Sequence, residues 1–316
     1  MKQTILFLSI FFIGFHSDVT AQTTDSSATD AGENLLALLN SNASEDPTQR
    51  YTEATFKTTR IANGHSIENV GKGVLDFRIN HRFGMLNQGI RDFFGLDNAT
   101  TRIGADYGIT ERLMIGVGRS TYLKDYDGFF KYKILRQTTN DKMPFSLSVL
   151  GTISIQTVDA YAPAGESYSF NNRLGYVSQL LLARKFSSAF SLQLMPTYLH
   201  YNLVQYRNDP NDIFSLGVGG RIKLTKRLSL TGEYYMLLGD RLRGTKNALS
   251  MGLDIETGGH VFQLLFTNAM GITERTVIGQ TFGDINKGAI HFGFNISRVF
   301  TIVKPKETEG MRNRVW

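Results

Sequence analysis

The chain has 316 residues, a formal net charge of +6 and no cysteine. The lack of cysteine excludes disulfides and thiolate metal sites, and a charge spread along the chain rather than gathered in a basic tract argues against a nucleic-acid partner. With 31 glycines, 22 phenylalanines, 13 tyrosines and only 6 prolines, the composition favours an all-β protein.

The first residues have the pattern of a secretory signal peptide. Lys2 precedes an apolar run over 5–14, and small residues at 19–21 precede Gln22. That run is too short to cross a bilayer as a helix, and no later stretch reaches 18 apolar residues. We therefore expect residues 1–21 to be removed on export, and any membrane span of the mature chain to be made of strands.

Residues 22–50 are rich in Ser, Thr, Asp and Asn, and their one apolar feature is Leu35 to Leu39. This composition predicts a flexible arm. Two interpretations stay open, a plain spacer or a docking segment for a partner protein. Residues 51–72 contain one possible short strand, Ala54 to Thr59, which we leave outside the strand count.

From residue 73 onward, apolar and polar residues alternate, which is typical of strands because successive side chains point to opposite faces. Most of the segments have the length that a tilted strand needs to cross the hydrocarbon layer. The pattern predicts twelve strands, near 73–83, 98–109, 112–122, 129–137, 145–156, 173–184, 190–202, 213–224, 228–238, 247–257, 260–268 and 288–300.

Short and long connections alternate between these strands. The connections at 110–111, 185–189, 225–227 and 258–259 are short, whereas those at 84–97, 157–172, 203–212 and 269–287 are long. Outer-membrane barrels have this asymmetry, with tight periplasmic turns and extended external loops. Counting from the first strand puts both termini in the periplasm, so a partner of the 22–50 arm would be a periplasmic protein.

The faces of the strands differ in the way that lipid outside and water inside require. Leu75, Phe77 and Ile79 share one side of the first strand, and charged residues share the other. A lipocalin-like soluble barrel would invert this, but loop asymmetry, strand number and strand length favour the membrane. We predict a transmembrane up-and-down antiparallel β-barrel of about 12 strands over residues 51–302, surrounded by outer-membrane lipid, with a tail at 303–316.

Two places depart from the pattern. Val177, Leu181 and Ala183 fall on the supposed polar face. Either the inward Leu181 meets a loop or the N-terminal arm folded into the lumen, or the register differs. Pro196 lies in the middle of a strand, where a closed barrel has no free edge, and we expect a bulge near it.

Residues 95–119, running from Gly95-Leu96-Asp97 through Asp106-Tyr107-Gly108 to Arg119, together with Tyr126-Asp127-Gly128 and Lys131-Tyr132-Lys133, resemble a β-barrel family of Bacteroidota that carries an uncharacterised-domain label. The resemblance covers residues 50–302. It implies an outer-membrane barrel and carries no catalytic residue, so it supports the fold and leaves the function open.

Charged residues on the inward parity are the candidate functional side chains. Eight are cationic and five are anionic, so an open lumen would weakly favour anions. The alternative is that these charges pair across the lumen and plug it, because a barrel of this size lies between filled and open barrels. We thus predict a narrow passive channel for small solutes or a plugged barrel, lined by Asp76, Arg78, Arg82, Arg102, Asp106, Lys131, Lys133, Arg173, Arg221, Lys223, Glu233, Asp254 and Glu256.

Other functions have less support. A scaffold could bind partner proteins through the long loops at 157–172 and 269–287. A lipid hydrolase, the remote alternative, would need His81 or His200 beside Ser120 or Ser178, but no motif joins them, and we expect no enzyme. The histidines are scattered and phosphate-binding patterns are absent, so we expect no metal and no cofactor. The glycines within 217–220 should relieve crowding within a strand or permit its curvature.

Overall fold

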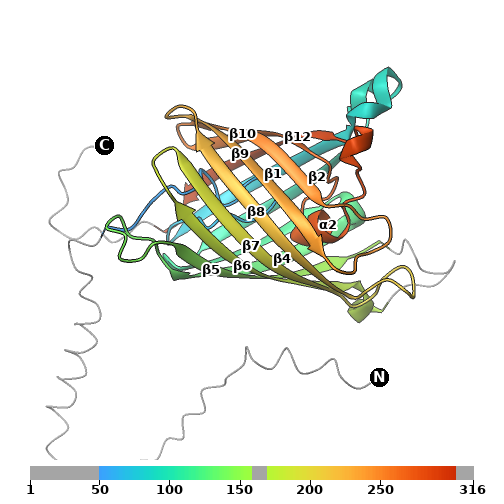
Figure 1. The fold of residues 1–316 in the computed structure, drawn as a ribbon, viewed down its shortest axis with the longest axis horizontal. Helices are drawn as coiled ribbons and strands as arrows, with labels where there is room; N and C mark the ends of the chain where they lie inside the picture. The colour runs from blue at the N-terminus through green and yellow to red at the C-terminus, as the bar shows by residue number, and fades with distance from the viewer. Residues whose placement is uncertain (1–49, 159–168, 304–316) are drawn as a thin grey trace, which may run out of the picture. The chain divides into compact units, whose positions relative to one another are not determined.

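The computed structural model describes residues 50–158 and 169–303. Twelve antiparallel strands form a closed barrel in which each strand pairs with its neighbours along the chain and the last strand pairs with the first (Figure 1). The prediction of a 12-stranded antiparallel barrel is therefore confirmed. The expected signal peptide (1–21), all but the last residue of the arm (22–50) and all but the first residue of the tail (303–316) lie outside the described residues.

The strands are β1 (Val74–Met85), β2 (Ala99–Gly108), β3 (Leu113–Ser120), β4 (Asp125–Leu135), β5 (Ser146–Gln156), β6 (Leu174–Lys185), β7 (Phe190–Tyr201), β8 (Asp212–Lys223), β9 (Leu228–Leu238), β10 (Ala248–Thr257), β11 (His260–Thr267) and β12 (His291–Thr301).

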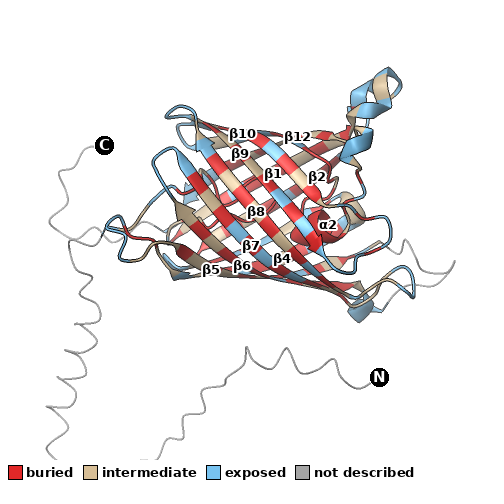
Figure 2. Ribbon diagram, viewed as in Figure 1, coloured by how far each residue is buried: buried red, intermediate tan, exposed pale blue. Residues whose placement is uncertain are grey.

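Burial alternates along the strands, as the banding in Figure 2 shows. In β1, Asp76 and Arg78 are buried and Phe77 between them is 39 % exposed. The other strands repeat this with outward Ile, Val, Phe and Leu side chains. A continuous apolar outer surface of this kind is suited to lipid rather than water. Within the described parts of the chain, none of the helices has the length and hydropathy to cross a bilayer.

The two ends of the barrel differ in their connections. At one end, which we call the short-turn end, four of the connections have four residues or fewer, and both Arg50 and Val303 lie there. The opposite end is the long-loop end. The alternation has two exceptions, because the connection at 136–145 is long for the short-turn end and the one at 121–124 is short for the long-loop end.

Two segments fill the barrel interior from opposite ends. The plug, residues 52–70, enters from the short-turn end, and every residue from 58 to 67 is buried. The inner loop, residues 268–284, is the first part of the connection from β11 to β12 at the long-loop end. It carries the short helix α2 (Glu274–Gly279), which lies inside the barrel wall (Figure 1). Two expectations are corrected. Residues 54–59 contain bends at 55–59 and no strand. Residues 271–279 are buried and form no external contact surface.

The apolar residues on the inward face of β6 are explained by these two segments. Val177, Leu181 and Ala183 belong to one buried cluster with apolar side chains of the plug and of α2. The interpretation that they meet a segment folded into the lumen is therefore confirmed, although the described segment is the plug. The plug and α2 residues of the cluster are Phe56, Ile61, Ile67, Val277 and Ile278.

The bulge expected near Pro196 is absent. Gln179 pairs with Thr197 and Leu182 with Leu194, which is one unbroken register between β6 and β7. On its other side Pro196 pairs with Leu216 of β8. Between β6 and β7, the residue pairs at and next to Pro196 are missing, because proline has no backbone N–H to donate.

Candidate functional site in the filled lumen

The deepest part of the plug is a tight hairpin. Ile61 N–H donates to the carbonyl of Gly64 at 2.9 Å, and Ser66 N–H donates to the carbonyl of Thr59 at 3.0 Å. Gly64 stands where a side chain would collide with the barrel, because a Cβ there would lie 1.8 Å from the Tyr235 hydroxyl. The hairpin therefore presents its tip, Ala62 and Asn63, directly to the barrel wall.

Polar side chains of the wall hold this tip. The Glu233 carboxylate of β9 accepts hydrogen bonds from the backbone N–H groups of Asn63 at 2.8 Å and Gly64 at 3.1 Å. Arg82 of β1 donates to the side-chain oxygen of Asn63, and Asn63 donates to the hydroxyl of Ser250 in β10, both at 2.8 Å. Three strands thus converge on two residues of the plug.

Backbone carbonyls of the plug are satisfied in the same way. A buried carbonyl needs a donor, and inside the barrel the donors are long wall side chains. Each bond is between 2.7 and 2.9 Å, made by Arg221 to Ala54, Gln263 to Ile61, Asn295 to Ala62, Gln193 to His65 and Lys131 to Ser66.

The plug and the inner loop are joined by a buried ion pair. Arg60 Nη1 lies 2.5 Å from Glu274 Oε1, and their side chains are 4 % and 2 % exposed. His65 Nε2 lies 3.6 Å from the same carboxylate oxygen. Burial, followed by the nearby cations, holds the pKa of His65 well below its ordinary value. The cations that act on it are Arg60 in the plug, Lys131 in β4, Arg102 in β2 and Arg78 in β1.

The structure places most of the sequence-predicted lumen residues in the interior. Nine are fully buried there, namely Asp76, Arg78, Arg82, Arg102, Asp106, Lys131, Arg221, Glu233 and Asp254. The remaining four are less buried, with Lys133, Lys223 and Arg173 half-buried and Glu256 exposed. Seven of the thirteen bind the plug directly, which are Arg78, Arg82, Asp106, Lys131, Arg221, Glu233 and Glu256.

Sequence reasoning missed five charged residues of the interior: Arg60, Asp125, Asp127, Glu274 and Arg275. Asp127 forms a two-pronged ion pair with Arg102, with Arg102 Nε 2.8 Å from Asp127 Oδ1. Both aspartates lie in β4, which begins four residues earlier than expected, and they share the parity of Lys131. That parity could have identified them, whereas the plug and inner loop have no alternation to follow.

The fully buried charges balance. Among the described residues, seven cationic and seven anionic side chains of Asp, Glu, Lys and Arg are fully buried. The positive surplus on which the anion preference rested is therefore absent from the filled interior. Charge pairing within the lumen, the alternative weighed from the sequence, describes what the structure contains.

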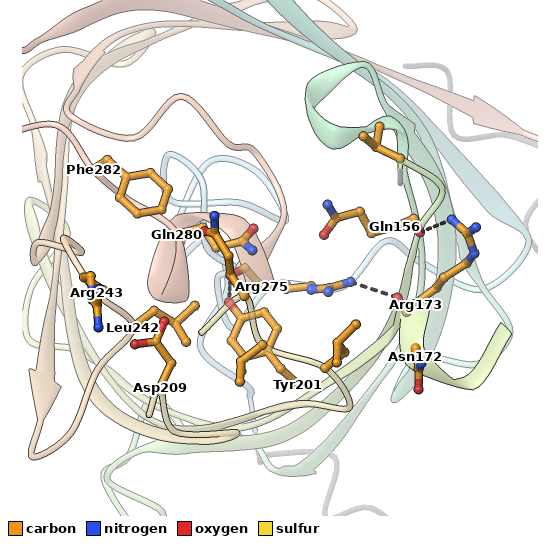
Figure 3. A pocket seen from close by; sticks show the side chains of 14 residues that line it. Gln156, Asn172, Arg173, Tyr201, Asp209, Leu242, Arg243, Arg275, Gln280 and Phe282 are labelled. Carbon is orange, nitrogen blue, oxygen red and sulfur yellow. Dashed lines mark hydrogen bonds between the residues drawn. The ribbon is translucent and has the colours of Figure 1, made fainter. Parts of the chain in front are cut away.

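Small cavities remain at each end of the filled region. The one at the short-turn end has a volume of about 170 Å³ and is lined by polar groups such as Glu68 and Lys133. The one at the long-loop end has a volume of about 60 Å³ (Figure 3). Gly219 makes room for the plug between them, because a Cβ there would lie 2.4 Å from Ile61 Cδ1, in agreement with the expectation that these glycines relieve crowding.

The outward histidines do not form a catalytic group with serine. His81 Nδ1 is 2.9 Å from the hydroxyl of Thr101, and His200 Nδ1 is 2.6 Å from Asp212 Oδ1. Among the described residues, neither histidine is hydrogen-bonded to a serine. Ser120 is buried in the interior, and Ser178 pairs across from Tyr198.

Comparisons with known proteins agree with this architecture. Residues 56–300 match the family model described as a membrane bound beta barrel domain (DUF5777). No curated protein matches the chain.

Similar solved structures are porins and other outer-membrane channels. The NanC porin is 11 % identical with a TM-score of 0.43, over 71 % of this chain and 98 % of that one. The KdgM porin is 9 % identical with a TM-score of 0.44, over 72 % and 99 %. The outer-membrane channel DcaP of Acinetobacter baumannii is 13 % identical with a TM-score of 0.31, over 64 % and 63 %. Since the family model covers more than half of the chain, this protein belongs to the membrane-bound β-barrel domain family and is an outer-membrane β-barrel.

Proposed function

We propose that this protein is an outer-membrane channel for small solutes that its own plug and inner loop hold closed. The observation that carries the proposal is that seven charged wall residues bind the plug directly, although Arg78–Asp76 and Arg102–Asp127 also pair within the wall. Removing the plug would leave a polar, charged wall that water can enter.

The path of the chain supports reversible plugging. The plug is continuous with the wall only at its C-terminal side, where it leads into β1, so it can leave through the short-turn end without breaking a strand pair. Many of its anchors are hydrogen bonds, each with a net contribution of about 1 kcal/mol because water replaces them on release. Docking is therefore weaker than the strand ladder around it.

An opened lumen would select weakly for charge. The fully buried side chains contributed by the strands alone comprise five cations and six anions, so the strand wall is nearly neutral. We therefore expect small solutes of either sign to pass and do not retain an anion preference. The resemblance also implies a Bacteroidota source, which stays a prediction.

A partner protein that binds the arm would be able to pull on the plug. Residues 22–50 precede the plug directly in the sequence, and their apolar Leu35 to Leu39 could bind a periplasmic protein that pulls on it. This partner is part of the proposal.

Planar-bilayer conductance tests the channel. We expect the full chain to be mostly silent. A variant that lacks residues 52–70 and in which a short glycine–serine linker replaces inner-loop residues 270–283 should conduct steadily. Heat-modifiable migration in gels shows whether the variant barrel is closed. A closed variant barrel that remains silent would refute the channel.

A scaffold is the second candidate, and one exposed feature favours it. The connection from β1 to β2 carries the 3-10 segment η1 (Leu86–Gly95), which projects from the long-loop end (Figure 1). Its Ile90, Phe93 and Phe94 are more than half exposed. Cross-linking in intact cells followed by purification would recover a partner through this segment if the protein is a scaffold, and the barrel alone if it is a free-standing channel.

A further inference from the structure

We propose that the cavity at the long-loop end is a binding site for the oxyanion group, carboxylate or phosphate, of a small solute. Among the described residues, three arginines line it, Arg173, Arg243 and Arg275, together with one carboxylate, Asp209 (Figure 3). They come from three separate connections of the barrel. The site stands on this cavity alone and does not require that the barrel conducts.

Arg275 is the residue of the site whose side chain is buried and held in place by other residues. It follows Glu274 in α2, and its side chain is 4 % exposed. Its Nη1 donates to the carbonyl of Arg173 at 3.2 Å and to the hydroxyl of Ser154 at 3.3 Å. The guanidinium lies over the ring of Tyr201 at 5.0 Å, and the Tyr201 hydroxyl donates to the Arg275 carbonyl at 2.9 Å. These contacts fix the guanidinium in place before any ligand arrives.

The hydrogen-bonding capacity of this guanidinium is only partly used. Among the described residues, Nη1 alone of its three nitrogens makes a hydrogen bond. Nη1 also forms a long ion pair with Asp125 Oδ1 at 3.8 Å, beyond hydrogen-bond reach, so Nε and Nη2 keep their hydrogen-bonding capacity. Buried cations are normally paired and hydrogen-bonded, so a partly satisfied one beside a cavity is a place where an anion gains more than it would in water.

A second side chain at the cavity has a buried polar atom whose hydrogen-bonding capacity is unused. The side-chain oxygen of Gln280 makes no hydrogen bond among the described residues. A glutamine amide can rotate to exchange its oxygen and nitrogen, so Gln280 can present N–H donors to an anion. Arg243, which stacks on Tyr206 at 4.3 Å, adds a charge at the outer rim.

The size of the cavity decides how much of a ligand it holds. Its volume is about 60 Å³, compared with roughly 30 Å³ for one water molecule in the liquid. That space suits a carboxylate or phosphate group, and the carbon skeleton of the solute would extend past Phe282 into the open mouth. The two ligand groups share one chemistry, so they are distinguished by experiment.

Calorimetric titration of the detergent-solubilised full chain with inorganic phosphate and, separately, with acetate tests the site. We expect saturable binding of at least one anion, and the tighter one identifies the ligand group. Arg243→Gln should weaken that binding about tenfold, as expected for loss of a charge-assisted contact. Arg241→Gln is the matched control, because Arg241 is exposed on the same loop but does not line the cavity.

The control also separates a site from general attraction to a basic surface. Binding that survives in Arg241→Gln and weakens in Arg243→Gln supports the site. Equal losses in both variants, or no saturable binding of either anion up to about 10 mM, would overturn it. Neither variant touches the plug, so the result is independent of whether the deletion variant conducts.

Discussion

Replacing Glu233 should release the plug more than any other single wall substitution. Its carboxylate accepts two backbone N–H bonds from the plug tip, at 2.8 and 3.1 Å. Hydrogen bonds to charged groups contribute about 1.5–3 kcal/mol each, so even the lower value gives about 3 kcal/mol for Glu233→Ala. At room temperature this is about a hundredfold increase in the undocked fraction. Glu233→Gln keeps an acceptor without the charge and should give about a tenfold increase.

Maleimide labelling measures this directly, because the chain has no cysteine of its own. Ala62→Cys places a single thiol at the plug tip, where the native residue is 1 % exposed. The labelling rate should rise in the order parent, Glu233→Gln, Glu233→Ala. Thr231→Val is the control, since Thr231 lies on the same face of β9 and bonds Asp254 rather than the plug. An Ala variant that labels within threefold of the parent would refute the reasoning.

Three further predictions use the same thiol or the intact protein. Gly219→Ala should speed labelling about tenfold, because its Cβ would displace Ile61 at an overpacking cost of roughly 1–3 kcal/mol. Gly220→Ala is the control: its Cβ meets only ordinary contacts, so the labelling rate should stay within twofold of the parent. Equal effects of the two substitutions would contradict the packing argument. Because the pKa of His65 is depressed in the docked state, the docked plug binds fewer protons than the free plug. Docking is therefore strongest above about pH 6.5 and weakens as the pH falls below that value. The loss of docking free energy is up to about 1.4 kcal/mol per pH unit. Relative to a free thiol labelled at the same pH, which corrects for the falling thiolate fraction, labelling should therefore accelerate from pH 7.5 to 5.5 in the parent and less so in His65→Gln. Identical corrected profiles would exclude His65 as the cause. Phospholipid hydrolysis by the parent should equal that of His200→Ala and of buffer, and turnover that depends on His200 would revive the hydrolase.

The barrel wall could be predicted from the sequence because lipid outside and polar groups inside impose a period of two on every strand. In β1, the alternation of Leu75 and Phe77 with Asp76 and Arg78 already fixes which side faces inward. A rule that considers one residue alone overestimated the local distortion of the sheet. The proline rule predicted a bulge at Pro196, but the neighbouring pairs hold the register and the ladder tolerates a gap.

The content of the lumen could not be predicted in the same way. The plug has a polar and irregular sequence whose conformation is set by wall residues far away in the chain, such as Glu233 and Gln263. From the sequence alone, the inner loop cannot be distinguished from an ordinary long connection between two strands. The one available signal was indirect, since Leu181 on the inward face required an apolar partner inside the barrel, and Ile61 and Ile67 supply it.

The central claim is that the plug tip docks on the inward face of the wall and closes the lumen. Asn63→Cys combined with Ser250→Cys tests it most directly, because the hydrogen bond from Asn63 Nδ2 to Ser250 Oγ at 2.8 Å places the two residues side by side and the chain has no other thiol. The account predicts that the pair forms a disulfide in the folded outer-membrane protein and that reductant is needed before any conductance appears. Failure of the pair to form, or equal cross-linking of Asn63→Cys to the outward-facing Ser178→Cys, would contradict it.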